Sequence, residues 1–330
     1  MLKHGLEKKL ILLLIILVFF AFLGGQAFAS SVQYNWVICT APAGGSYFAL
    51  GAGFSQVLAD KLDMKVQVQV TNGEVQNAIL VGSEDAELGF SGSPTLLSAW
   101  NGTDWAKKEY KDLRLIAPLN FVVFQVFSLK GKGINSVYDL EGKKIVAGEA
   151  GSSHDIHSRR ILDLLGIKPA KIYNLPKQDA TGNLRDGLVD ASLMVTAIPS
   201  SIIIELEATH DIVMVTLSEE DIGKVVKKYK YFIPCTIPKG IYKTVTKDFK
   251  TVKVSNNIIT HKDMPAEIIY KVTKAWFDNI ETLIMSHPSA KQSVPESIIY
   301  GVIPLHEGAY KYYKEIGLDV EHLNPPEAKQ

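Results

Sequence analysis

Four stretches of the sequence combine glycine, serine or threonine with the expected start of a helix, directly after an expected strand. They are residues 43–47, 91–94, 151–154 and 196–200. A helix N-terminus presents unpaired N–H groups and a partial positive charge, so it binds anions without a dedicated arginine. Serine and threonine at such places can equally be ordinary helix N-caps. For the four stretches together we favour a binding site for a small carboxylate.

The candidate ligand-binding residues come from these junctions and from one neighbouring helix. Tyr47 could stack on a ligand or pack against its own helix. Asn77, in the first turn of an expected helix, carries an amide that can both donate and accept a hydrogen bond. The residues that we expect to contact the ligand are Ser46, Tyr47, Asn77, Ser91, Ser152, Ser153, His154 and Thr196.

Two other chemistries are conceivable at the same places. The run from His154 to His157 offers two histidines and an aspartate, but no third metal ligand is marked by spacing, so we expect no metal. Residues 89–93 (GFSGS) approach the G-x-S-x-G nucleophile elbow, yet the last glycine is replaced and Ser91 has no identifiable histidine partner. We expect a non-enzymatic protein without a cofactor, and keep a secreted serine hydrolase as the alternative.

Alternating strands and helices must position these junctions. The expected strands are residues 32–40, 65–71, 86–90, 144–147, 171–175 and 191–195, and helical spacing fills the intervals between them. This alternation predicts an α/β fold with parallel strands and crossover helices.

The pattern repeats within the chain. The motif G-x-x-D-A at residues 82–86 recurs at residues 187–191, and a proline follows each aspartate at the same distance, Pro94 and Pro199. Such an internal repeat predicts two lobes built on one plan. We expect lobe 1 to comprise residues 30–117 and 238–330 and lobe 2 to comprise residues 118–237. Hinge strands are expected near residues 117–127 and 231–237, and one long amphipathic helix over residues 265–285.

The N-terminus has the pattern of a secretion signal. Basic residues at positions 3–9 precede an apolar run over residues 10–23, and the small-x-small sequence Ala27-Phe28-Ala29 follows. The run is shorter than the roughly twenty residues of a membrane span. We expect cleavage after about Ala29, no lipoprotein anchor because no cysteine follows the cut, and a periplasmic location. A retained N-terminal anchor is the alternative.

Charge and cysteine content narrow the function further. Basic and acidic residues balance at 35 each, so the chain lacks the positive charge typical of a nucleic-acid-binding protein. The only cysteines, Cys39 and Cys235, lie in separate apolar runs. An oxidising compartment would permit a disulfide, but we expect two separate buried thiols.

Several longer peptides resemble the TAXI-type solute-binding subunits of TRAP transporters. They are residues 40–51 (TAPAGGSYFALG), 71–77 (TNGEVQN), 137–147 (VYDLEGKKIVA) and 304–313 (PLHEGAYKYY). The last peptide is the most specific, because no generic structural rule explains it. The resemblance implies a two-lobed, periplasmic binding protein-like fold with two parallel or mixed sheets flanked by helices. A ligand cleft would lie between the lobes and close by a hinge.

The resemblance also implies the partners. A small organic anion or amino-acid-like solute would be captured and handed to membrane permease subunits, by a monomer that binds no nucleic acid. Known ligands of the family are mostly glutamate-like, but Phe90, His154 and Ile198 depart from its pattern. We therefore expect a solute less polar than glutamate. A solute-binding protein of an ATP-driven importer and a stand-alone sensor remain alternatives.

Overall fold

The computed structural model describes residues 35–43, 45–150 and 152–329. The expected signal sequence over residues 1–29, and Gly44 and Gly151 of the two expected loops, lie outside the described residues. In the described part of the chain, no helix combines the length and apolar character needed to cross a membrane.

The described residues form strands and helices in alternation. The strands are β1 (Asn35–Cys39), β2 (Lys65–Gln69), β3 (Leu88–Gly92), β4 (Leu113–Leu129), β5 (Lys144–Val146), β6 (Lys171–Tyr173), β7 (Ala191–Thr196), β8 (Ile212–Val215), β9 (Ile233–Ile237) and β10 (Phe249–His261). The α-helices are α2 (Ser46–Leu62), α3 (Glu74–Gly82), α4 (Ser93–Asn101), α5 (Ser153–Leu165), α6 (Lys177–Arg185), α7 (Ser201–Thr209), α8 (Glu219–Lys228), α9 (Ala266–Asp278), α10 (Ile280–Ser286) and α11 (Glu307–Glu315). Short 3-10 helices are η1 (Val137–Leu140), η2 (Pro288–Gln292), η3 (Pro295–Tyr300), η4 (Glu321–Leu323) and η5 (Pro326–Lys329).

Ten strands form one sheet in the order β2-β1-β3-β10-β4-β7-β5-β6, with β8 beside β4 and β9 beside β10. β1 is parallel to β2 and β3, and β5 is parallel to β6 and β7. Each of these triplets has the order second-first-third and is followed by one antiparallel strand, β10 or β4. This shared order confirms the predicted repeat. We call the half that contains β1–β3 lobe 1 and the half that contains β5–β7 lobe 2.

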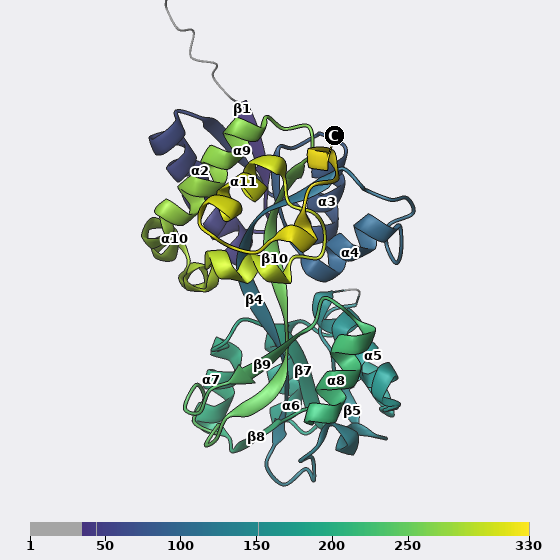
Figure 1. Cartoon of the computed structure of the whole chain (residues 1–330). Helices are drawn as coiled ribbons and strands as arrows, with labels where there is room; N and C mark the ends of the chain where they lie inside the picture. Colours follow the sequence, from purple (N-terminus) through teal and green to yellow (C-terminus); the bar gives the residue numbers. More distant parts are fainter. Residues whose placement is uncertain (1–34, 44, 151, 330) are drawn as a thin grey trace, which may run out of the picture. The chain divides into compact units, whose positions relative to one another are not determined.

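The two long strands β4 and β10 run through both lobes (Figure 1). They pair with each other from Leu113–His261 to Val123–Lys253, with register shifts between Asn256 and Asn257 and again two residues later. β10 also pairs with β3 at one end and with β9 at the other, while β4 pairs with β7 and β8. The two sheets expected from the sequence are therefore joined into one.

The segment expected as the second hinge strand lies within lobe 2. Residues 233–237 form β9, which pairs with the first half of β10. Tyr242, Val245 and Phe249 then pack with Ile237 in one hydrophobic cluster of lobe 2. The chain thus returns to lobe 1 through β10, later than the expected boundary at residue 238, because the residues after β9 still find apolar partners in lobe 2.

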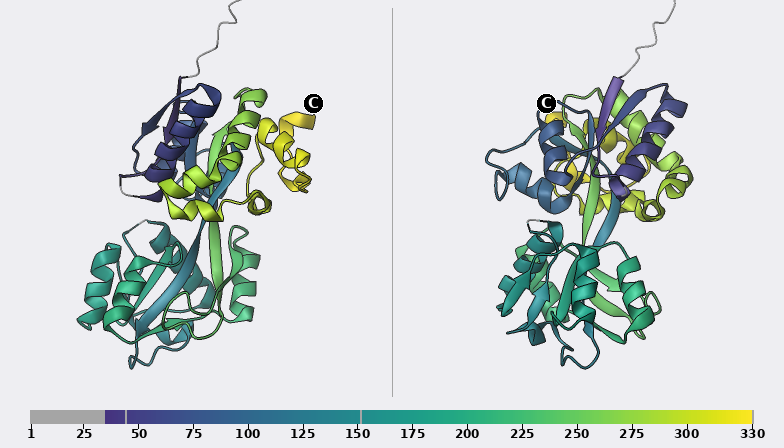
Figure 2. Two further views of the ribbon diagram at one scale, coloured as in Figure 1. Left: turned by 90° about the vertical axis from the view of Figure 1, so that its left-hand side faces the viewer. Right: turned by 180° about the vertical axis from the view of Figure 1, so that it is seen from behind.

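Alternate residues of β4 build two hydrophobic clusters in lobe 2. Phe124 and Val126 join residues of α5 and α8, whereas Val123 and Phe127 join residues of α6 and α7. Successive side chains of a strand point to opposite faces of the sheet, so β4 is apolar on both faces here. Figure 2 shows helices on both sides of the lobe 2 strands.

The prediction of a single long helix over residues 265–285 is wrong, because Asn279 divides this segment into α9 and α10. Asn279 has non-helical backbone angles, φ −117° and ψ 27°, and its Nδ2 donates to the carbonyl of Ala275. The break allows α10 to pack on α2, where Gly53 lies directly against Leu283 and Ser286.

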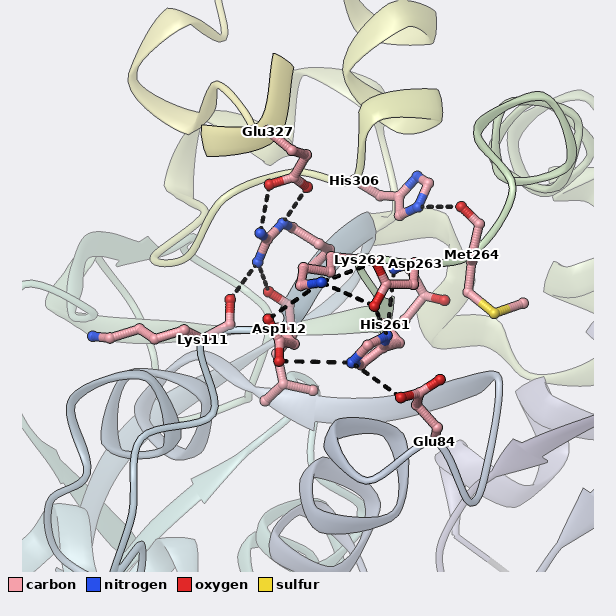
Figure 3. Close-up of polar contacts among 12 residues, drawn as sticks. Glu84, Lys111, Asp112, His261, Lys262, Asp263, Met264, His306 and Glu327 are labelled. Atoms are coloured by element: carbon pink, nitrogen blue, oxygen red, sulfur yellow. Dashed lines mark hydrogen bonds and ion pairs between the residues drawn. The ribbon is translucent and has the colours of Figure 1, made fainter. Parts of the chain in front are cut away.

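The peptide over residues 304–313 has a structural role that its sequence did not suggest. The backbone of Leu305 forms a bridge to Leu115 of β4. His306 is the N-cap of α11: its Nδ1 accepts from the N–H of Gly308 at 3.1 Å, and its Nε2 lies 3.0 Å from the carbonyl oxygen of Met264 (Figure 3). Gly308 sits so close to the backbone of α9 that no side chain would fit. The peptide therefore holds α11 against β4 and α9.

The C-terminal helix η5 is attached to β4 by a buried arginine. Nε and Nη2 of Arg114 donate to the two carboxylate oxygens of Glu327 at 2.8 and 2.6 Å (Figure 3). Arg114 is 2% exposed. A bidentate salt bridge of this kind is stronger than an ion pair with a single hydrogen bond.

Burial lowers the pKa of His306 to about 4. The unfolded chain therefore binds a proton below about pH 6.5 that the folded chain accepts only near pH 4, and stability falls as the pH drops between these values. We predict that His306→Asn, which keeps an N-cap acceptor, removes up to about 3 kcal/mol of this loss. Urea unfolding at neutral and acidic pH measures it. His322→Asn, at an exposed histidine, should keep the wild-type pH dependence. An unchanged pH dependence in His306→Asn would contradict the prediction.

Candidate functional site

A pocket of about 420 Å³ opens between the lobes. Lobe 1 lines it with residues from α2, α3, α4 and the segment after α4, and lobe 2 lines it with the N-terminal half of α5. This volume lies within the usual range of small-molecule sites.

One face of α5 forms the lobe 2 wall. Ser153, Ile156, His157 and Arg160 recur at the three- and four-residue spacing that places side chains on one side of a helix. Ser152 precedes them as the N-cap, and its hydroxyl accepts a backbone N–H of the first turn at 3.3 Å. The wall therefore combines a helix N-terminus with a full positive charge two turns along the same helix.

On the lobe 1 side, the carboxylate of Glu74 occupies the N-terminus of α4. It accepts hydrogen bonds from the hydroxyls of Thr95 at 2.8 Å and Tyr47 at 3.3 Å, and from the backbone N–H of Gly92. A Cβ at Gly92 would collide with this carboxylate. Burial raises the pKa of Glu74, and the three hydrogen bonds oppose that shift only in part. The protein itself thus supplies the anion at this helix end.

An ion pair joins the two walls. Nη2 of Arg160 lies 2.8 Å from Oδ2 of Asp104, in the segment after α4. Nη1 of Arg160 donates to the hydroxyl of Tyr231 at 2.7 Å, and Ser98 donates to Asp104 from the lobe 1 side. Burial alone would raise the pKa of Asp104, but Ser98 and Arg160 outweigh it and hold that pKa low.

Two polar atoms of the pocket wall are buried without a hydrogen-bond partner among the described residues. They are Nε1 of Trp105 and Nδ1 of His157. The ring of His157 packs against Tyr231 and Phe232, with centroids 5.7 and 5.5 Å away. Burial, aided by the charge of Arg160, lowers the pKa of His157 to about 3, so the ring is neutral.

Three of the expected ligand contacts line this pocket: Tyr47, Ser152 and Ser153. The other five are not in its described lining: Ser46, Asn77, Ser91, His154 and Thr196.

Most of these five side chains have partners inside the protein. The amide of Asn77 donates to the carbonyls of Thr40 and Phe90 at 2.6 and 2.7 Å. Ser91 donates to the carbonyl of Glu74 at 3.3 Å. Nδ1 of His154 accepts the backbone N–H of the residue before Thr196 at 2.8 Å. Thr196 at the end of β7 and Ser46 at the start of α2 are both half-buried.

The pair of histidines on α5 does not converge on a common point. His154 faces β7, Asp155 pairs with Arg159 at 2.6 Å, and His157 faces the pocket. In the part of the chain that the structure describes, a different group brings possible metal ligands within 4.8 Å of one another: Glu84, His261 and Asp263. None of these three lines the pocket. Lys262 donates to both carboxylate oxygens of Asp263 at 2.9 Å, which compensates part of that cluster's negative charge.

The two cysteines form no disulfide. Cys39 is buried in β1 and Cys235 is half-buried in β9. Burial raises the pKa of Cys39 to about 12 and also raises that of Cys235.

Sequence reasoning missed the charged residues of the site. Glu74 and Arg160 lie on helices that the sequence predicted, and Arg160 follows Ser153 at two-turn spacing. This periodicity could have indicated a polar helix face that begins at an expected anion site. Asp104 and Trp105 lie in a loop, where spacing carries no such information.

Comparison with known proteins agrees with this architecture. A TctC solute binding protein from Polaromonas has a similar structure, with a TM-score of 0.57 and 16% identity over 88% of this chain and 99% of that one. A Xanthomonas citri protein bound to a chloride ion matches with a TM-score of 0.50 and 10% identity over 87% of this chain and 96% of that one. These likenesses show the two-lobed α/β fold. Residues 38–317 match the model of the NMT1-like family, and the chain therefore belongs to that family.

Proposed function

We propose that this protein is an exported, non-enzymatic receptor that captures a small carboxylate-bearing solute. It would deliver the solute to the membrane permease subunits of a TRAP-type secondary transporter. The observation that carries the proposal is a solute-sized pocket lined by both lobes, with an arginine and a helix N-terminus in its lobe 2 wall.

The positive features of the pocket support an anionic solute. Ser152 and Ser153, at the N-terminus of α5, line the pocket, and Arg160 lies on the same helix. A helix N-terminus and a guanidinium both favour negative charge. On the opposite wall, Glu74 already fills the N-terminus of α4. We therefore place the carboxylate of the solute against lobe 2.

Apolar side chains support a solute less polar than glutamate. Val75 and Pro94 line the pocket from lobe 1, and Ile156 lines it from lobe 2. Phe90, one of the departures from the family pattern, is fully buried and packs edge-on against Tyr47 with centroids 5.4 Å apart. Ile198 instead packs on the core of lobe 2, so it does not add to this argument.

Closure around the solute would use β4 and β10 as the hinge, because these strands connect the lobes. With β10 as the returning strand, we propose that lobe 2 comprises about residues 118–254 and lobe 1 the remainder of the described chain. The assignment to a TRAP-type transporter rests on the peptides that resemble TAXI-type subunits, and periplasmic export rests on the N-terminal pattern. Neighbouring genes for a TRAP-type membrane subunit would support this partner, and an ATPase gene would point to an ATP-driven importer.

The environment of Ser91 supports a non-enzymatic role. Its side chain is fully buried, and its hydroxyl donates to a backbone carbonyl of α3. A nucleophilic serine instead needs a base that accepts its proton and room for a substrate.

Calorimetry with sodium salts of L-glutamate, hexanoate and phenylacetate tests the proposed solute class. We predict that a carboxylate with an apolar body binds at least about tenfold more tightly than glutamate, because the described pocket lining offers apolar side chains beyond the positive N-terminus of α5. Matching primary alcohols, which lack the charge, serve as controls and should not bind. Tight binding of glutamate alone would contradict the prediction.

Replacement of Glu74 tests its place in the pocket. Burial raises the pKa of Glu74, so this carboxyl takes up a proton more readily than an ordinary glutamate as the pH falls, and wild-type affinity for an anionic solute should rise as the pH is lowered. We predict that Glu74→Gln binds about three- to tenfold more tightly at neutral pH and loses this pH dependence. Glu84→Gln, two residues after the end of α3 and outside the described pocket lining, should behave as wild type. Weaker anion binding by Glu74→Gln would contradict the prediction.

A further inference from the structure

Two residues that line the pocket each carry a buried polar atom with no hydrogen-bond partner among the described residues. The indole N–H of Trp105 comes from lobe 1 and Nδ1 of His157 comes from lobe 2. A buried polar group without a hydrogen bond costs about 1–3 kcal/mol. Unpaired groups of this kind are therefore expected where a ligand supplies the missing partner.

Arg160 lines the same pocket as these two residues and carries the positive charge of its described lining. Its side chain is 21% exposed, and Asp104 is its acidic partner at 2.8 Å. The guanidinium also lies 5.8 Å from the ring centroids of Tyr229 and Tyr231, and the hydroxyl of Tyr231 accepts from it. These tyrosines hold the guanidinium in place without neutralising it.

Asp104 is a replaceable partner. Its side chain comes from the opposite lobe and is 47% exposed, compared with 21% for the side chain of Arg160. Ser98 donates to the same carboxylate, and solvent can reach it. Asp104 would therefore keep hydrogen-bond partners if Arg160 turned to another anion.

We propose that Arg160, Trp105 and His157 bind the anionic group of the solute, and that Asp104 occupies Arg160 until the solute arrives. This inference rests on the proposed function and assigns the residues that would bind the carboxylate of the solute. The two oxygens of a carboxylate match the paired donors of a guanidinium. The indole N–H of Trp105 and, in its Nδ1-protonated tautomer, the neutral ring of His157 would donate further hydrogen bonds to this carboxylate.

The exchange makes Asp104 an internal competitor. In the structure, the ion pair between Asp104 and Arg160 links the lobes. When the carboxylate of the solute takes this place, the same arginine fixes the solute instead. Removal of Asp104 should therefore strengthen binding, whereas removal of Arg160 should weaken it.

The experiment compares adjacent arginines. The probe is the member of the panel of glutamate, hexanoate and phenylacetate that binds wild type most tightly by calorimetry. We expect Arg160→Gln to weaken binding by about 30- to 100-fold and Trp105→Phe by about three- to tenfold. Arg159→Gln is the matched control, because Arg159 pairs with Asp155 and is not among the described residues that line the pocket. It should stay within about twofold of wild type.

Asp104→Asn is the decisive variant, because the proposal predicts that it binds the probe more tightly and misfolding would not tighten binding. We expect it to bind the probe about two- to fivefold more tightly, the value of a partly exposed ion pair. Weaker binding by Asp104→Asn, or equal effects of Arg160→Gln and Arg159→Gln, would overturn the inference and leave the proposed function intact. If wild type binds no member of the panel at about 1 mM, both the proposed function and this inference fail.

Discussion

The antiparallel pairing of β4 with β10 is the constraint on which the remaining structure depends. Both strands are buried along nearly their whole length, and each contributes hydrogen bonds and apolar side chains to both lobes. Their pairing determines which strands lie next to them in the sheet. As a result, the carboxyl ends of the two parallel triplets point toward one another. The pocket exists because the helices that follow these strand ends, α4 and α5 among them, meet across the pair.

Local patterns predicted most of the elements, because each rests on neighbouring residues. The helix over α5 and the strand at β7 follow from apolar spacing and from Gly166 as a C-cap, which the structure gives in the left-handed conformation at φ 72°. The return through β10 could not be predicted in this way. It depends on Tyr242 and Phe249 finding partners in a core whose other members are distant in sequence. The division at Asn279 likewise depends on α2, against which α10 packs.

The site shows the same limit more sharply. Serines at helix starts are visible in a sequence, and Ser152 and Ser153 lie in the pocket lining. The sequence does not show whether a helix N-terminus is free to bind a ligand, because the side chain that occupies it comes from another helix or strand. Glu74 reaches the end of α4 from the start of α3, and Arg160 meets Asp104 from the other lobe. Such contacts between distant residues decide the charge of the pocket.

The carboxylate of Glu74 at the end of α4 has a consequence for selectivity. A vacant helix N-terminus attracts any small anion, including the chloride and phosphate that surround a protein in its environment. A helix end that already holds a carboxylate offers these ions nothing and repels them. Burial raises the pKa of Glu74, and its carboxylate disfavours the binding of abundant inorganic anions at this end of the pocket, which leaves the pocket to a scarcer organic solute.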